Sequence, residues 1–142
     1  MKRSKSYIKI LIIPGNIQTP KAYPFWDRLL EMLKEHEVRK LEGMLKEQEI
    51  MDLINATDLW ISIDSFVPHL VAYHKLKPGI VLWAKSDPLI FGYPTNTNLL
   101  KDRKYLKAEQ FRWWKDEPMD IDAHVDPEVI LREINKWTPT IS

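Results

Sequence analysis

The chain has 142 residues, enough for a single domain that buries about two-thirds of the surface its unfolded form exposes. Hydrophobic residues make up 44% and charged residues 29%, and the 21 basic and 20 acidic side chains nearly cancel, so the overall charge indicates neither a nucleic-acid partner nor a membrane surface. The absence of cysteine excludes disulfides, thiolate metal ligands and thiol nucleophiles, and it is compatible with the reducing cytoplasm, where we expect this protein.

The N-terminal half predicts strands that alternate with helices. Residues 8–13 are almost continuously apolar and β-branched, which is typical of a strand covered on both faces of a parallel sheet. Pro24 suits the first position of a helix. The apolar side chains of that helix recur at helical spacing: Trp26, Leu29, Leu30 and Leu33. A short strand over 38–41 and a helix over 44–55 follow.

The C-terminal half continues the alternation. Its predicted elements are a strand over 59–63, a helix over 67–75, a strand over 80–83, an edge strand over 98–101 and a helix from Asp126-Pro127 to about Trp137. Residues 86–94 read as turns. No apolar run reaches the roughly 18 residues that span a bilayer, so we expect a soluble protein without a membrane span. The pattern predicts one α/β domain over 1–142, a small three-layer Rossmann-like domain with a mostly parallel sheet of four to five strands.

The most informative segment is 56–70, a buried strand that leads directly into the N-terminus of a helix. Open α/β sheets bind ligands at the carboxyl ends of their strands, and a helix N-terminus attracts phosphate. Asp64 either organises the loop or contacts the ligand, and Ser65 either caps the helix or donates its hydroxyl to a phosphate. His69 either packs between helix and sheet or reaches a phosphate or sugar hydroxyl.

Further candidates follow two other strands. Thr19 and Lys21 lie in the loop after the first strand, where a lysine binds phosphate as a point charge, although most loop lysines are merely solvated. Ser86 and Asp87 follow the strand over 80–83 and are candidates for contact with a bound sugar. Asp87-Pro88 is equally a turn starter.

Two segments nearer the C-terminus are weaker candidates for a ligand site. Residues 120–122 read Asp-Ile-Asp, and in an extended chain both carboxylates would project to one side, as metal-bound diphosphate requires; a solvated acidic loop is the plainer interpretation. Residues 111–115 are Phe-Arg-Trp-Trp-Lys, and a modest basic patch precedes them: Lys101, Arg103, Lys104 and Lys107. Aromatics that seal a sheet edge or meet a partner explain this segment better than nucleic-acid binding.

Four segments, in order, resemble the heptosyltransferase family (glycosyltransferase family 9). Residues 64–70 resemble its D-S/T-G-x-x-H-L-A signature, and residues 78–88 resemble its K-P-x-V-x-L-F-G-x-T-D-P segment. Residues 12–15 with Lys21 and Pro24 are similar to its H-P-G and K-x-W-P opening, and residues 126–130 to the start of its last helix.

The resemblance implies the C-terminal, donor-binding half of a GT-B fold, in which two Rossmann-like halves face each other. Its ligand would be a nucleotide sugar, with an ADP-linked heptose as the typical donor, transferred with inversion and without a metal or other cofactor. The donor-binding candidates would be Thr19, Lys21, Asp64, Ser65, His69, Ser86 and Asp87. The acceptor half and the general base would come from a second chain or from another copy of this one.

Two positions depart from the family pattern. Phe66 and Ala84 stand where the family has glycines, which allow a backbone to approach a pyrophosphate closely. The segment between Leu33 and Met44 is also short, as if one βα unit were missing. These departures leave an alternative open, a non-catalytic module that keeps the fold and binds a protein or a glycan through exposed aromatics, Trp113 and Trp114 foremost.

Overall fold

A computed structural model describes residues 7–15, 21–43, 45–111 and 120–137. Its centre is one five-stranded sheet in which every neighbouring pair of strands is parallel. The strands are β1 (Lys9–Ile13), β2 (Glu37–Lys40), β3 (Leu59–Ile63), β4 (Ile80–Trp83) and β5 (Thr97–Leu100). Their spatial order is β2-β1-β3-β4-β5, so β3 lies at the centre and β2 and β5 form the edges.

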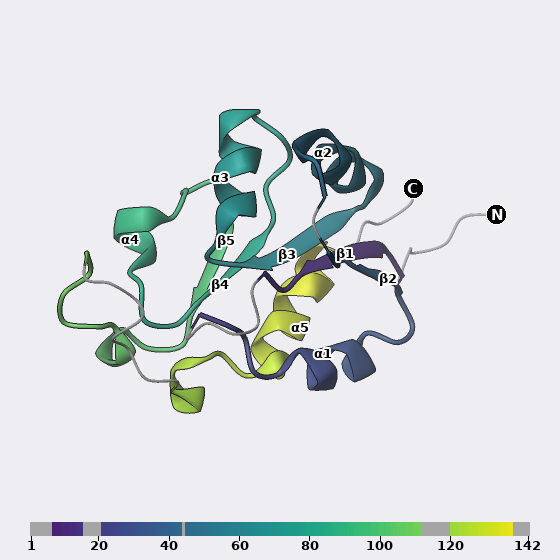
Figure 1. Cartoon of the computed structure of the whole chain (residues 1–142). Coiled ribbons are helices and arrows are strands. Elements are labelled where there is room, and N and C mark those ends of the chain that lie inside the picture. The colour runs from purple at the N-terminus through teal and green to yellow at the C-terminus, as the bar shows by residue number, and fades with distance from the viewer. Residues whose placement is uncertain (1–6, 16–20, 44, 112–119, 138–142) are drawn as a thin grey trace.

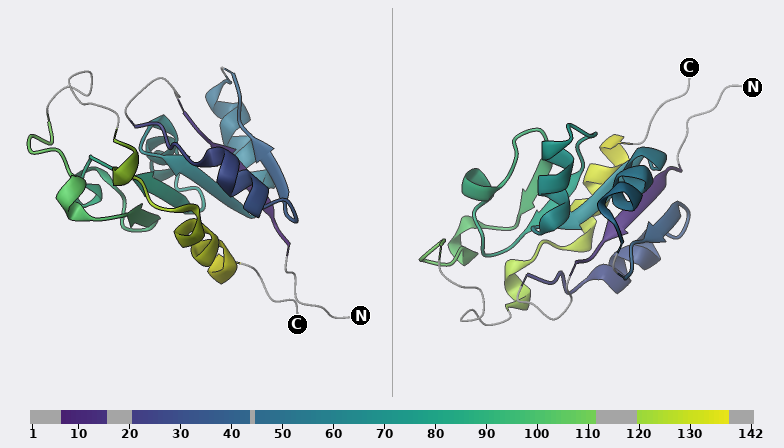
Figure 2. Two further views of the ribbon diagram at one scale, coloured as in Figure 1. Left: turned by 90° about the horizontal axis from the view of Figure 1, so that it is seen from below. Right: turned by 45° about the horizontal axis from the view of Figure 1, so that its top comes forward.

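Helices cover both faces of this sheet (Figure 1). The α-helices are α1 (Trp26–Met32), α2 (Glu47–Ala56), α3 (Phe66–Tyr73), α4 (Pro88–Phe91) and α5 (Pro127–Trp137). Figure 1 shows α2 and α3 above the sheet and α1 and α5 below it, and Figure 2 shows α1 and α5 side by side on their face. Two short 3-10 turns complete the described structure, η1 (Arg103–Tyr105) and η3 (Ile121–Ala123). The predicted three-layer α/β fold is confirmed.

Alternating side chains of the strands supply two separate cores. In β1, Ile10 and Ile12 pack against α1 and α5, whereas Leu11 and Ile13 pack against α2 and α3. Since successive side chains of a strand point to opposite faces, only a run that is apolar at every position can serve both layers. β3 meets this requirement along its whole length, because all five of its residues are buried.

The strand order places a topological switch point between β1 and β3. From β1 the chain passes through α1 to β2 on one side of β1, and then from β2 through α2 to β3 on the other side. The register pairs Ile12 with Ile61 of β3 and with Lys40 of β2. Loops that leave adjacent strands toward opposite faces open a crevice at the carboxyl edge of the sheet, where such folds bind ligands.

Two local expectations differ from the structure. α1 begins at Trp26 with Phe25 as its N-cap, so Pro24 precedes the helix instead of opening it. The turn-rich region over 86–94 also holds the unpredicted α4, because the Asp87 carboxylate accepts a hydrogen bond from the Leu89 amide and Pro88 takes the first helical position. Residues 120–122 lie in a loop, as the plainer interpretation has it: Asp120 caps the 3-10 turn η3 by accepting from the Asp122 amide at 3.1 Å, and the extended form that the metal alternative needs is not formed.

Across the described ranges, no helix has both the length and the apolar character that crossing a lipid bilayer requires.

Candidate functional site at the carboxyl edge of the sheet

A cavity of about 280 Å³ lies where β3 and β4 end. Four of the residues expected to bind a ligand line it: Lys21, Asp64, His69 and Ser86. They come from the loop after β1, the end of β3, helix α3 and the loop after β4. We call this space the edge cavity. Its remaining walls are Phe91, Lys107, Gln110 and Phe111.

An ion pair joins the loop after β1 to the end of β3. The Lys21 ammonium lies 3.5 Å from a carboxylate oxygen of Asp64, and the two side chains are 29% and 13% exposed. Partial burial strengthens such a contact relative to one at the open surface. Asp64 therefore holds Lys21 at the cavity wall and offsets part of its charge, which is the loop-organising role that the sequence offered for Asp64.

The turn between β3 and α3 offers backbone donors. Ser65 occupies the N-cap position of α3, but its side chain makes no capping bond; its hydroxyl instead donates to the Ile63 carbonyl at 3.4 Å. The side-chain cap expected there is therefore wrong. The first amides of a helix, here those of Phe66 and Val67, have no partner within the helix, so they are the donors that an anion meets at this end.

A second cavity, of about 470 Å³, is lined by Ser65 and Phe66 and by the ends of β1 and β2. We call it the switch cavity, because it lies beside the switch point of the sheet. Gly15 forms part of its wall with a φ of +68°, and a Cβ there would lie 3.0 Å from the Ile63 side chain. Glycine is thus required both by the left-handed backbone and by the close approach of the loop to β3.

His69 lies between the edge cavity and a third cavity of about 600 Å³ on the outer side of α3. Its Nδ1 is 2.7 Å from the Tyr93 hydroxyl, and the two rings meet edge to face. This contact fixes the orientation of the imidazole at the border between the two cavities. Exposed aromatic side chains, Phe66 and Tyr73, line the third cavity.

The two candidates after β4 have different surroundings. Ser86 is 3% exposed and lines the edge cavity. Asp87 is engaged elsewhere: its carboxylate accepts two hydrogen bonds from the Arg103 guanidinium, at 2.6 and 3.1 Å. Those bonds hold the pKa of Asp87 below its usual value, so the group stays ionised. Within this structure Asp87 organises the loop and caps α4.

Sequence reasoning missed half of the edge cavity. The sequence places Lys107 only in a basic patch and Phe111 only in an aromatic segment, whereas both line the cavity with Phe91 and Gln110. The rings of Phe91 and Phe111 meet edge to face, with centroids 5.4 Å apart. Their position in the chain could have revealed them. The segment after an edge strand of a parallel sheet starts at the same carboxyl edge as the other loops, so the residues after β5 are expected near the cavity.

Some expectations fall outside the described residues, namely Thr19 and the aromatic pair Trp113 and Trp114. Among the residues that the structure describes, no group of three or more histidine, aspartate or glutamate side chains is placed to hold a metal ion.

Comparison of the chain with protein-family models, with curated proteins and with solved structures finds no match. The fold, the cavities and the residues that line them are therefore the basis for inferring a function.

Proposed function

We propose that this chain binds a nucleotide sugar at the carboxyl edge of its sheet, as the donor-binding half of a glycosyltransferase-like enzyme. One observation carries the proposal. Lys21, Asp64 and Ser86 belong to three separate segments that resemble the heptosyltransferase family, and all three line the edge cavity. Residues more than 20 positions apart in sequence share one small space at the edge where doubly wound sheets bind their ligands.

The cavities on this edge suit the parts of such a ligand. The edge cavity offers ammonium, carboxylate, hydroxyl and amide groups, which bind sugar hydroxyls and phosphate oxygens. The switch cavity has more apolar walls, including Ile13, Leu41 and Val67, which suit a planar base. Asp64 lines the first cavity and Ser65 the second, so the N-terminus of α3 is where a diphosphate that joins the two parts would lie.

The chemistry that this arrangement supports is stabilisation of a leaving group. When a sugar leaves a nucleoside diphosphate, negative charge grows on the diphosphate, and helix amides together with lysine ammonium groups stabilise that charge. We assign no general base to this chain. The acceptor site and the base would be supplied by a second chain or by another copy of this one, so the isolated domain is expected to bind the donor without transferring its sugar to an acceptor.

The test is calorimetric titration of the purified chain with ADP, UDP, GDP and CMP and their common sugar conjugates. We expect saturable binding of one nucleotide and a rise in melting temperature, since a ligand that binds only the native state stabilises it. Lys21→Ala should weaken binding by about tenfold or more, because a hydrogen bond to a charged group contributes about 1.5–3 kcal/mol. Lys34→Ala is the matched control, since Lys34 is an exposed lysine that pairs with Glu31 at the surface.

A second pair of variants tests the border of the cavity. His69→Ala should weaken nucleotide binding, whereas His74→Ala, on the same helical segment but outside the edge cavity, should not. Absence of any binding at millimolar nucleotide would overturn the proposal and direct attention to a protein or glycan partner for the exposed aromatic side chains.

A further inference from the structure

Lys107 is a lysine buried in the wall of the edge cavity. The residue is 7% exposed, and lysine is rarely buried to this extent in folded proteins. Its ammonium donates to the carbonyl oxygens of Gln110 at 2.8 Å and of Glu109 at 3.3 Å. The charge is therefore held at a fixed place beside the cavity instead of on a mobile surface side chain.

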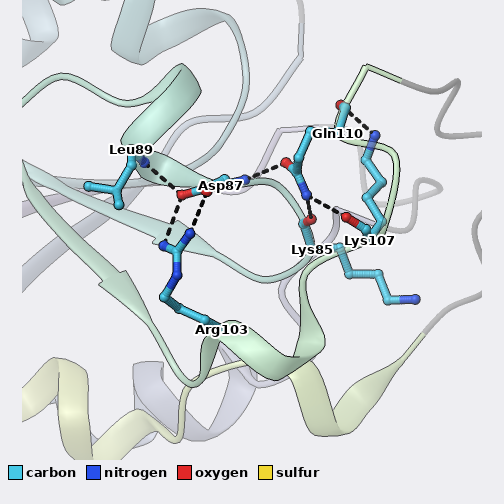
Figure 3. Close-up of polar contacts among 6 residues, drawn as sticks. All are labelled: Lys85, Asp87, Leu89, Arg103, Lys107 and Gln110. Carbon is cyan, nitrogen blue, oxygen red and sulfur yellow. Dashed lines mark hydrogen bonds and ion pairs between the residues drawn. The ribbon is translucent and has the colours of Figure 1, made fainter.

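A single amide side chain fixes the segment that carries Lys107. The Gln110 side chain donates to the carbonyl oxygens of Lys85 at 3.0 Å and of Lys107 at 2.8 Å. Its own oxygen accepts from the Asp87 amide at 2.7 Å (Figure 3). The Lys107 backbone adds a fourth bond, donating to the Lys85 carbonyl at 2.9 Å. The segment around Lys107 is thus bonded directly to the loop after β4, which carries Ser86.

An ion pair anchors the other side of the same loop. Arg103 holds the Asp87 carboxylate through two hydrogen bonds, and one of the same carboxylate oxygens accepts from the Leu89 amide (Figure 3). Because charge-assisted, two-point contacts fix geometry as well as contribute energy, the loop after β4 cannot shift without breaking them. Residues 85–89 and 103–110 therefore form one connected unit beside the cavity.

We propose that Lys107 binds a phosphate group of the ligand in the edge cavity and that Gln110 is the positioning residue that holds it there. The inference rests on the proposed function and extends it to a residue outside the four resembling segments. Lys21 shares its charge with Asp64, 3.5 Å away, so an anion in this cavity gains from a further cation. Lys107 is the other lysine among the described residues that line it. A charge in a partly buried wall attracts an anion more strongly than one in open solvent.

The test uses pyrophosphate, which carries the charge without a base or a sugar. Calorimetry would compare the unaltered chain with Lys107→Met, which keeps an unbranched side chain one atom shorter than lysine and removes its charge. We expect at least about tenfold weaker binding and a smaller dependence of affinity on salt, since screening acts on charge pairs. Lys104→Met is the matched control, because Lys104 is exposed in the same segment, and it should change the affinity by less than twofold.

Gln110→Met separates positioning from charge. This variant removes the amide and keeps Lys107, so we expect weaker pyrophosphate binding with an unchanged dependence on salt. Gln48→Met is its control, since the Gln48 amide is exposed and bonds only to Asp52 of the same helix among the contacts described. Unfolding free energies measured without pyrophosphate report any structural effect of each variant separately from its effect on binding.

Two results overturn the inference in distinguishable ways. If the unaltered chain binds pyrophosphate and Lys107→Met binds it within twofold, or with the same salt dependence, Lys107 has no role and the proposed function stands. If the unaltered chain binds neither pyrophosphate nor any nucleotide, both proposals fail. Should Lys107→Met not fold, the unaltered chain still decides: pyrophosphate must shift the NMR resonance of the Lys107 ε-methylene group, and an unshifted resonance at saturation refutes the contact.

Discussion

His124 is expected to make this protein less stable as the pH falls below neutral. It precedes α5, is 4% exposed, and packs edge to face on Tyr23 with ring centroids 6.0 Å apart. Burial lowers the pKa of His124 from 6.5 to about 4, since the charged imidazolium would lose its hydration. The Lys101 ammonium acts in the same direction, whereas the Asp120 carboxylate opposes it.

The sign and size follow from linkage. A group whose pKa is lower in the folded state binds more protons when unfolded, so acid favours unfolding. The loss begins near the unfolded pKa of 6.5 and is complete below the folded value of about 4. Between pH 8 and pH 5, protonation of His124 in the unfolded chain should lower the free energy of unfolding by about 2 kcal/mol. The slope is about 1.4 kcal/mol for each pH unit where the pH lies between the unfolded and the folded pKa.

The assay is urea unfolding at pH 8, 7, 6 and 5 for the unaltered chain and for His124→Phe, which keeps an aromatic ring against Tyr23. The difference between the two free energies isolates His124, because other titrating groups contribute equally to both proteins. His74→Gln is the matched control, as His74 is exposed, and its curve should run parallel to that of the unaltered chain. Parallel curves for His124→Phe would refute the assigned burial of a neutral imidazole.

Three further predictions concern the fold and the ligand. Gly79→Ala should lower the free energy of unfolding by about 2 kcal/mol or more in urea, because a Cβ there would lie 2.3 Å from the Trp60 indole; an unchanged midpoint would contradict that contact. Tyr23→Phe removes the buried hydrogen bond to the Val125 carbonyl and should lower the free energy of unfolding, measured in urea, by about 1–3 kcal/mol. Burial also raises the pKa of Tyr23, so the unaltered chain should lose stability above pH 10 and Tyr23→Phe should lose less. Phe66→Gly should tighten nucleotide binding in calorimetry relative to Phe66→Ala, since glycine lets the backbone approach a phosphate; equal affinities would argue against that approach.

The central strands were predictable because β3 and β4 are buried, largely apolar runs, whereas the edge strands β2 and β5 mix polar and apolar residues. β3 and β4 lie at the predicted residues, 59–63 and 80–83, and α5 ends at Trp137 as expected. α4 escaped prediction because a helix of four residues has no periodicity to detect. The start of α1 was misplaced because Pro24 is equally compatible with the turn before a helix.

The edge cavity was only half predictable, for a different physical reason. Lys21, Asp64, His69 and Ser86 lie in the segments that leave the carboxyl ends of predicted strands, so their place at this edge follows from topology. The opposite wall depends on hydrogen bonds between side chains and backbone that are 23 and 25 residues apart in the chain, those of Gln110 with Asp87 and Lys85. Such contacts leave no local pattern in a sequence, and a glutamine in a polar segment reads as solvated.

The most direct test of a ligand site at the carboxyl edge is backbone amide NMR during titration with the nucleotide sugar that binds best in calorimetry. We expect shifts concentrated near the carboxyl edge of the sheet, at Gly15, Phe66, His69, Ser86 and Lys107, with little change in α5 or on the outer side of α2. Shifts confined to the outer side of α3 around Tyr73, or spread evenly over the chain, would contradict it.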